Sequence, residues 1–418
     1  MNDILQAGAI VDAAAAALES RVIGWRRDFH QHPELSNRET RTAQCVAEHL
    51  RGLGMAVQTG VAHTGVVGLL DSGRPGPVVA LRADMDALPV IEEVDLPFAS
   101  RAKATYRGQE VGVMHACGHD CHVAILMGVA QILAGMRERL AGRVKFIFQP
   151  AEEGPPPGEE GGAALMIRQG VLENPKPDVI FGLHVFAGIE AGTLAYRPGP
   201  TLASSDRIKI TVEGRQTHGA LPWRGVDPIV ISSQIVLGLQ TIVSRQVDVT
   251  LEPAVLSIGA IRGGVRDNII PDRVEMLGTV RTFNEDMRRD IHARIRNTVE
   301  LIAKSAEATA SVHFDNAYPV TVNDVPLTER VVPTLRRVAG ADKVFLGQKI
   351  TGYEDFSYYQ QKVPGFFYFV GITPPGTDRR LCAPNHSPRF FVDESALLLG
   401  VRSLAHLALD TMAAAGSP

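Results

Sequence analysis

Thiol, imidazole and carboxylate side chains concentrate in one short segment of the sequence. Residues 115–122 read His-Ala-Cys-Gly-His-Asp-Cys-His, and within them Cys117 and His119 flank a single glycine. Cysteine, histidine and aspartate are ligand types that zinc and related divalent ions accept. A lone histidine is more often structural, but three of them beside a thiol and a carboxylate favour a metal site. The segment therefore predicts a divalent-metal site and leaves the metal open.

Two adjacent glutamates, Glu152 and Glu153, form a second candidate group. Neighbouring side chains on an extended segment point in different directions, so the two carboxylates need not contact the same atom. One can bind a metal ion while the other acts as general base on a metal-activated water, as metal-assisted hydrolysis requires. The alternative is a solvated acidic pair, which we expect for Glu159 and Glu160 nearby.

These residues need structural elements that bring them together. Three near-continuous apolar runs predict parallel strands buried on both faces, at 78–82, 143–149 and 179–183. Asp84 and Asp86 follow the first run, Glu152 and Glu153 the second, and His184 the third. Parallel strands of an α/β sheet end at one edge, where open sheets bind ligands. We therefore expect these side chains to share that edge.

The order of predicted elements indicates two domains. In the first half, strand-like runs alternate with helical spacing such as that at 122–140, which predicts an α/β domain with a mostly parallel sheet. A small α+β layer follows, with strands at 207–213, 254–261 and 273–282 and helices near 226–247 and 285–308. The α/β pattern resumes near 314, with a strand at 366–371 and a helix at 393–412. We expect a discontinuous α/β domain over 1–197 and 314–418, interrupted by an α+β domain over 198–313.

The composition excludes several protein classes. The chain has 418 residues, too many for one ordinary core, and its 45% hydrophobic and 21% charged residues are typical of folded proteins. A net charge of −4, with basic residues spread along the chain, argues against a nucleic-acid surface. Asp3 and Asp12 interrupt the N-terminal segment where a secretory signal would be basic and apolar. No apolar run approaches the ~20 residues of a membrane-spanning helix. From these two patterns we expect a soluble, cytoplasmic protein. Four scattered cysteines are too few for a disulfide framework in a chain of this length.

Further polar residues lie in the inserted segment and late in the chain. His218, Asn268 and Arg281 could bind an oxyanion and a carboxylate, the arginine through a bidentate fork. The alternative for Arg281 is a surface salt bridge. His386 lies in the polar segment 385–389 and by itself indicates little.

Taken together, these segments resemble one known family. The sequence resembles the amidohydrolase branch of the dinuclear metallopeptidases, which includes carboxypeptidase G, aminoacylase, hippurate hydrolase and the plant indoleacetyl-amino-acid hydrolases. The matching segments occur in order along nearly the whole chain: RRDFHQHPELSNRET (26–40), RADMDALPV (82–90), MHACGHDCHVA (114–124), QPAEEG (149–154), GLHV (182–185), VEGRQTHGALP (212–222), RDNIIPD (266–272), GYEDFS (352–357) and NHSPRF (385–390).

The resemblance implies a role for each matching position. The metal ligands of this branch match Cys117, His119, Glu153, His184 and His386. Glu152 matches the carboxylate that deprotonates the attacking water, and Asp86 matches an aspartate that orients a metal-site residue. His218 matches a histidine that reaches the partner subunit's active site and steadies the oxyanion. Asn268 and Arg281 resemble residues near the substrate's carboxylate. Ala83 and Asp84 stand where other branches have a His-x-Asp motif, so the role of Asp84 stays open.

The implied activity is metal-dependent hydrolysis of the amide bond of N-acyl-L-amino acids, with acetyl, benzoyl or other aryl-acyl groups. Two divalent ions are expected, zinc first, with manganese, cobalt and nickel also compatible with these ligands. The inserted domain is expected to act as a lid and dimerisation domain in a homodimer or higher homo-oligomer. The alternatives are a dipeptidase or carboxypeptidase of the same family, a thiol hydrolase with Cys117 as nucleophile, and a binding protein built on an inactive hydrolase.

Overall fold

The structure is a computed structural model that describes residues 2–414. The chain divides into two compact units. Unit 1 comprises Met1–Gly199, Asn323–Gln348 and Tyr358–Pro418, and unit 2 comprises Pro200–Val322 and Lys349–Ser357. The sequence placed the inserted segment at 198–313, whereas the strand at Thr309–Tyr318 pairs with a strand of unit 2, so the chain leaves that unit later.

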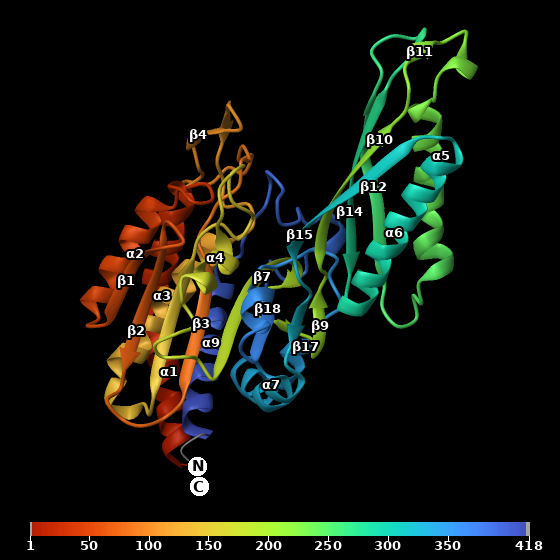
Figure 1. Cartoon of the computed structure of the whole chain (residues 1–418). Helices are drawn as coiled ribbons and strands as arrows, with labels where there is room; N and C mark the ends of the chain where they lie inside the picture. The colour runs from red at the N-terminus through yellow and green to blue at the C-terminus, as the bar shows by residue number, and fades with distance from the viewer. Residues whose placement is uncertain (1, 415–418) are drawn as a thin grey trace. The chain divides into compact units, whose positions relative to one another are not determined.

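Unit 1 is built on an eight-stranded sheet (Figure 1). Its strands, in spatial order, are β1 (Ala56–Val61), β2 (Gly65–Asp71), β6 (Arg143–Gln149), β3 (Val78–Asp84), β7 (Val179–Glu190), β18 (Gly365–Thr373), β8 (Leu194–Tyr196) and β17 (Val344–Leu346). The central strands β6, β3, β7 and β18 are parallel to one another, while the β1–β2, β2–β6 and β18–β8 pairs are antiparallel. The predicted α/β architecture with a mostly parallel sheet is confirmed.

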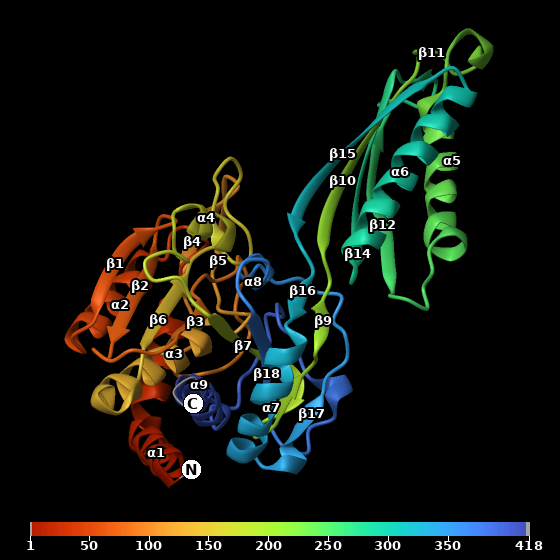
Figure 2. The same cartoon turned by 60° about the horizontal axis from the view of Figure 1, so that its bottom comes forward.

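Helices cover both faces of this sheet. The helices of unit 1 are α1 (Asn2–Gln31), α2 (Thr40–Gly52), α3 (His119–Gly135), α4 (Gly162–Arg168), α7 (Val325–Ala339) and α9 (Ala396–Ala414), and α8 (Phe356–Gln360) begins at the end of unit 2. Helices α1, α3 and α9 pack against one another, and α3 and α9 contact β3 (Figure 2). Helix α3 is apolar around nearly its whole circumference because it is buried on all sides.

Unit 2 is a smaller α+β layer. Its antiparallel sheet has the order β12 (Ala254–Gly263), β14 (Arg273–Thr282), β10 (Ser205–Glu213) and β15 (Thr309–Tyr318). Helices α5 (Pro228–Thr241), continued by a π-helical turn at Ile242–Gln246, and α6 (Glu285–Ser305) pack against it. Strand β10 alternates as predicted, with Ile208 and Ile210 buried and Arg207 and Lys209 exposed.

Short elements complete the chain. They are the pairs β4 (Lys103–Tyr106) with β5 (Gln109–Gly112), β9 (Gly199–Leu202) with β16 (Thr321–Asn323), and β11 (Thr217–His218) with β13 (Ile269–Ile270). Single 3₁₀ turns lie at Arg137–Arg139, Pro222–Arg224, Ala341–Lys343 and Arg379–Leu381.

Two sequence-based expectations about element ends were wrong. The helix expected at 122–140 begins three residues earlier, at His119, and ends at Gly135 before a separate 3₁₀ turn. His184 does not follow its strand but lies within it, because β7 continues to Glu190. At His119 and at His184, tertiary packing extends the regular structure through polar residues.

Within residues 2–414, two helical stretches are long and apolar enough to cross a membrane, judged by length and composition alone. Helix α9 is one of them. Of the most apolar stretch of this helix, 72% is buried inside the protein, as in the core helix of a globular domain. The other is Pro228–Gln246 of unit 2, of which 33% is buried.

Candidate metal centre

The central strands of unit 1 bring the predicted residues to one edge of the sheet. Register places Asp84 opposite Gln149 on β6 and Arg82 opposite Gly182 on β7. Asp86, the turn after β6 and His184 therefore lie at the same level of three neighbouring strands.

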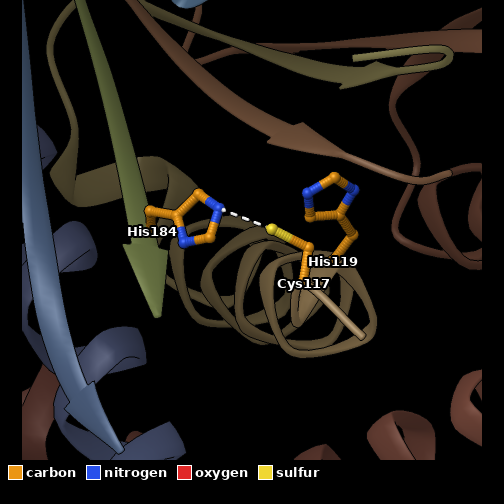
Figure 3. Close-up of side chains that lie close together, drawn as sticks. All are labelled: Cys117, His119 and His184. Carbon is orange, nitrogen blue, oxygen red and sulfur yellow. Dashed lines mark hydrogen bonds between the residues drawn. The ribbon is translucent and has the colours of Figure 1, made fainter. Parts of the chain in front are cut away.

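Gly118 explains how the chain presents both Cys117 and His119 to this edge. It is the N-cap residue of α3 and has φ +94°, a conformation that L side chains rarely adopt. A Cβ at this position would lie 2.3 Å from Val185 Cγ2, so the backbone passes too close to β7 for any other residue. The tight turn directs the Cys117 sulfur at His184 and sets the His119 ring beside Cys117, as Figure 3 shows.

Among the described residues, two of the groups of ligand-type atoms share Cys117. In each group the candidate ligand atoms lie within 4.8 Å of one another. The first contains Cys117, His119 and His184, and the second contains Cys117, Glu153 and His386. Cys117 Sγ lies 3.4 Å from His184 Nε2, and His386 Nε2 lies 3.0 Å from Glu153 Oε1. The structure thus brings together all five residues for which the sequence predicted metal binding.

His184 is fixed in a form suited to coordination. Its Nδ1–H donates to the carbonyl of Val185 at 2.7 Å, which leaves the lone pair of Nε2 directed at Cys117. Burial and the neighbouring His122 hold the pKa of His184 well below its usual value, so the ring is neutral.

His119 is oriented by a carboxylate. Its Nδ1 lies 3.3 Å from Asp86 Oδ1, and neither of its buried ring nitrogens has a hydrogen-bond partner of ordinary geometry among residues 2–414. Burial opposes protonation, but the charges of Asp84 and Asp86 raise the pKa of His119 to about 10. A carboxylate behind one ring nitrogen and an unpaired nitrogen in front is the arrangement of metal-binding histidines.

Asp84 and His122 support the centre from behind. His122 Nδ1–H donates to Asp84 Oδ1 at 2.5 Å, and His122 Nε2 accepts the N–H of Val185 at 2.9 Å. Asp84 also accepts a hydrogen bond from Arg82 at 2.5 Å. Burial alone would raise the pKa of Asp84, but His119, His122 and Arg82 hold it well below its usual value. Through these hydrogen bonds, Asp84 and His122 fix strand β7 beside His184. Because both ring nitrogens of His122 are hydrogen-bonded, His122 is not free to bind an ion.

Asp86 shapes the turn that carries the two glutamates. Its Oδ1 accepts the N–H of Glu152 at 3.0 Å, and its Oδ2 accepts the N–H of Glu153 at 3.1 Å and the hydroxyl of Ser36 at 2.7 Å. Glu152 is buried, and its Oε2 lies 3.9 Å from His119 Nε2. The carboxylates of Glu152 and Glu153 thus reach the same centre from one turn. The carboxylate of Asp86 holds the backbone of that turn.

Asn385 attaches the His386 loop to the rest of the centre. Its Nδ2 donates to the carbonyls of Cys117 and Val185 at 3.0 and 3.2 Å, and its Oδ1 accepts the N–H of Ala187 at 3.1 Å. His386 has φ +73° and donates its backbone N–H to the carbonyl of Ala116. The sequence interpretation missed this function of Asn385, since its partners are far away in the chain and no local pattern identifies them.

The electrostatics of the cluster fit a cation. Burial and the carboxylates of Glu153, Glu152 and Asp84 raise the pKa of the Cys117 thiol well above its usual value. A divalent cation reverses this balance, because it stabilises thiolate and carboxylates together. Thiol, imidazole and carboxylate donors, with the buried Nε2 of His119 free of hydrogen bonds to the described residues, therefore fit a divalent metal ion.

His218, Asn268 and Arg281 belong to unit 2. His218 and Asn268 lie together there, because β11 pairs with β13 and the N–H of Gly219 donates to the carbonyl of Asn268. Arg281 lies on β14 with its guanidinium 4.8 Å above the ring of Tyr353, and its Nη1 has no hydrogen-bond partner among residues 2–414. No salt bridge of Arg281 is found within that part of the chain, so the surface salt bridge considered from the sequence does not form there.

Comparison with known proteins places this geometry in context. A model of peptidase family M20/M25/M40 matches residues 80–410. Thermostable carboxypeptidase 2 of Saccharolobus solfataricus is 42% identical over 395 residues, 94% of this chain and 95% of that protein. N-acyl-L-amino acid amidohydrolase of Geobacillus stearothermophilus is 42% identical over 306 residues, 73% of this chain and 79% of that protein. N-acetylcysteine deacetylase of Bacillus subtilis is 38% identical over 397 residues, 95% and 98% of the two chains.

Solved structures show the same fold. A protein from methicillin-resistant Staphylococcus aureus matches with a TM-score of 0.89 and 35% identity, covering 97% of this chain and all of that one. A dinuclear metal-binding peptidase of the M20 family from Bacillus subtilis matches with a TM-score of 0.79 and 34% identity, covering 95% and 99% of the two chains.

Proposed function

The chain belongs to peptidase family M20/M25/M40, and from that premise we propose that it hydrolyses the amide bond of N-acyl-L-amino acids. It is a hydrolase of the amide-cleaving kind, as the amidohydrolases and deacetylases among its relatives indicate. The observation that carries the narrower proposal is the buried Glu152 carboxylate beside a thiol-containing ligand cluster.

We assign the ligand roles as the two groups suggest. Cys117, His119, Glu153, His184 and His386 hold two divalent ions, of which zinc fits this mixture of sulfur, nitrogen and oxygen donors, as manganese, cobalt and nickel also can. When bound, the ions supply Lewis acidity that polarises the acyl carbonyl and lowers the pKa of the attacking water.

Glu152 performs the proton transfers in this proposal. Its carboxylate accepts a proton from the attacking water and later donates it to the leaving amine, so that a carboxylic acid and a free amino acid are released. Asp86 keeps Glu152 and Glu153 in place through their backbone N–H groups and orients His119. Burial of Glu152 keeps bulk water from competing for the proton.

Residues of unit 2 complete the substrate site in this proposal. The N–H of Ala220 donates to His218 Nδ1 at 3.0 Å, so the neutral ring carries its proton on Nε2, where it can be donated to an oxyanion. Asn268 lies beside it, and the unpaired guanidinium nitrogen of Arg281 suits the substrate's carboxylate. His218 is proposed to act on the site of a partner subunit.

A homodimer is part of the same proposal. Helix α5 exposes Ile229, Val230 and Leu237, the last to 71%, which is unusual for apolar residues on one helix of a monomer. A second copy of the chain that covers this face would bury it. A cytoplasmic location also stays a prediction, supported by four cysteines that form no disulfide.

A carboxypeptidase of the same family is the second candidate, favoured by the carboxypeptidase relative at 42% identity. A thiol hydrolase is disfavoured, because the raised pKa of Cys117 leaves its sulfur protonated and weakly nucleophilic when no cation is bound.

The decisive experiment removes the metal, restores single divalent ions, and assays N-acetyl, N-benzoyl and longer N-acyl amino acids beside C-terminally free dipeptides. We expect chelation to abolish hydrolysis and an added ion to restore it, with N-acyl amino acids cleaved faster than dipeptides. Faster cleavage of dipeptides would favour the carboxypeptidase. Full activity after chelation would contradict the metal-dependent proposal and favour the thiol hydrolase.

A further inference from the structure

We propose that Glu39 is a positioning residue for Glu152 and Glu153, because its buried carboxyl group holds the backbone of the turn from which they project. This inference rests on the proposed function. Glu39 lies in the segment between α1 and α2, far in sequence from the residues of the metal centre. The proposed function assigns no role to it.

Glu39 occupies the N-cap position of α2 but does not cap the helix. N-cap side chains normally accept hydrogen bonds from the first backbone N–H groups of their helix. Here Glu34 does so instead, with its two oxygens accepting the N–H groups of Arg41 and Thr42, each at 2.9 Å. The Glu39 side chain is therefore available for another purpose, and a residue that breaks a local preference often serves a site.

That purpose is visible in the contacts of the carboxyl group. Glu39 Oε1 accepts the N–H of Ala151 at 2.9 Å, and Oε2 accepts the hydroxyl of Thr64 at 2.5 Å. Asp86 accepts the N–H groups of Glu152 and Glu153. Three successive backbone N–H groups, 151 to 153, are thus held by two buried carboxyl groups.

The turn needs this support. Ala151 has φ +52°, a left-handed conformation that is strained for a residue other than glycine and persists only where its surroundings enforce it. Glu39 is fully buried, and burying a carboxyl group costs free energy unless hydrogen bonds satisfy it. The hydrogen bond from the N–H of Ala151 to the Glu39 carboxyl group offsets both the strain at Ala151 and the cost of burying Glu39.

Neighbouring residues bind the same region. Ser36 donates to Asp86 at 2.7 Å, and Asn37 donates to the carbonyl of Glu160 at 3.0 Å. Burial, with the nearby charge of Asp86, raises the pKa of Glu39 to about 8. A neutral amide is therefore a close substitute, because its oxygen can accept the N–H of Ala151 while its NH2 group donates to the Thr64 hydroxyl.

The test compares Glu39→Ala, Glu39→Gln and the matched control Glu34→Ala in the full-length, zinc-loaded enzyme. Glu34 makes the same kind of contact, a carboxylate on two backbone N–H groups, but to α2 rather than to the turn. We expect Glu39→Ala to lower kcat by about 10- to 100-fold with little change in KM and to weaken zinc retention on dialysis. Glu39→Gln should restore kcat to within a few-fold of the wild type, and Glu34→Ala should lower the melting temperature without lowering kcat.

Hydrogen exchange supplies a readout that needs no activity. Peptides covering 150–154 should exchange faster in Glu39→Ala than in Glu39→Gln or Glu34→Ala. Unchanged exchange in Glu39→Ala, or an equal loss of kcat in Glu39→Ala and Glu34→Ala, would overturn the inference. Because exchange is measured whether or not N-acyl amino acids are cleaved, failure of the proposed function would be recognised separately.

Discussion

At the scale of single residues, the centre combines buried carboxylates that would repel one another in the absence of positive charge. Asp84, Asp86 and Glu152 are all buried, and the charges of His119, His122 and Arg82 hold the pKa of Asp84 well below its usual value. A bound divalent ion would add further positive charge beside these carboxylates. Among these acids Glu152 has a separate assigned role, because it is the proposed proton carrier.

Replacement of Glu152 by glutamine tests that role. Glutamine keeps the size and polarity of the side chain but cannot accept the proton, so we expect kcat to fall by about 10²–10⁴-fold, the usual contribution of a general base. The metal content of the purified variant, measured by elemental analysis, should stay that of the wild type, because Glu152 is not assigned as a ligand.

Glu159→Gln is the matched control for this substitution. Glu159 lies in the same loop but pairs with Arg38 at the surface, so its replacement should leave kcat within a few-fold of the wild type. Near-normal turnover of Glu152→Gln with metal bound would show that another group carries the proton.

Part of the centre could be predicted from local sequence and part could not. The spacing of Cys117 and His119 and the polar residues after three apolar strands were sufficient to predict their convergence, because parallel strands end at a common edge. His386 was indicated by the family resemblance alone. Glu39 and Asn385 gave no local signal, since a single glutamate or asparagine becomes informative only once the fold places it beside Ala151 or Cys117.

At the scale of elements, the start of α3 is the most constrained point of unit 1. Gly118→Ala would force a Cβ to 2.3 Å from Val185 Cγ2 at a φ of +94°. We expect a loss of about 1–3 kcal/mol in the free energy of unfolding, because α3 must move away from β7 or strain its turn. Metal content should fall as well, since Cys117 and His119 move with the turn. Denaturant titration and elemental analysis check both effects.

Gly135→Ala, at the other end of α3, serves as the control. A Cβ there meets nothing within 4 Å, and the residue is helical without a positive φ. We expect stability equal to the wild type or up to about 1 kcal/mol higher, because alanine favours the helix. If Gly118→Ala and Gly135→Ala had the same stability and metal content, the contact between a Cβ at residue 118 and Val185 would be relieved without loss of stability.

In unit 2, Asp206 on β10 connects the sheet to α6 and predicts a response to pH. Burial alone would raise the pKa of Asp206, but hydrogen bonds from His292 and Arg288 lower it. A lowered pKa in the folded state means that stabilisation is present above the unfolded value of about 3.9 and is lost as the pH falls through the folded value. We therefore expect Asp206→Asn to lose about 3 kcal/mol near neutral pH and to show a flatter dependence of stability on pH below about 5.

Hydrogen exchange of α6 measured across this range reports on unit 2 directly. Asp315→Asn is the control, because Asp315 is exposed and only weakly paired with Arg207. Its replacement should change stability by less than about 0.5 kcal/mol at every pH. A steep loss of α6 protection below about pH 4 that is the same in Asp206→Asn and in the wild type would mean that other groups govern the acid response.

At the scale of the whole molecule, the proposed site draws on two chains, since Glu152 belongs to unit 1 and His218 is proposed to act on a partner's centre. Glu152→Gln and His218→Ala should each be nearly inactive, the second through loss of an oxyanion donor worth about 10²–10³-fold in kcat. In a mixed dimer, however, one centre has Glu152 from the His218→Ala chain and His218 from the Glu152→Gln chain.

Random pairing after co-expression makes half the dimers mixed, each with one intact centre, so activity should recover to about a quarter of the wild type. Native mass spectrometry would verify the mixed dimers. If they form and activity stays at the level of the parents, His218 does not serve the partner's centre and the two-chain site is wrong.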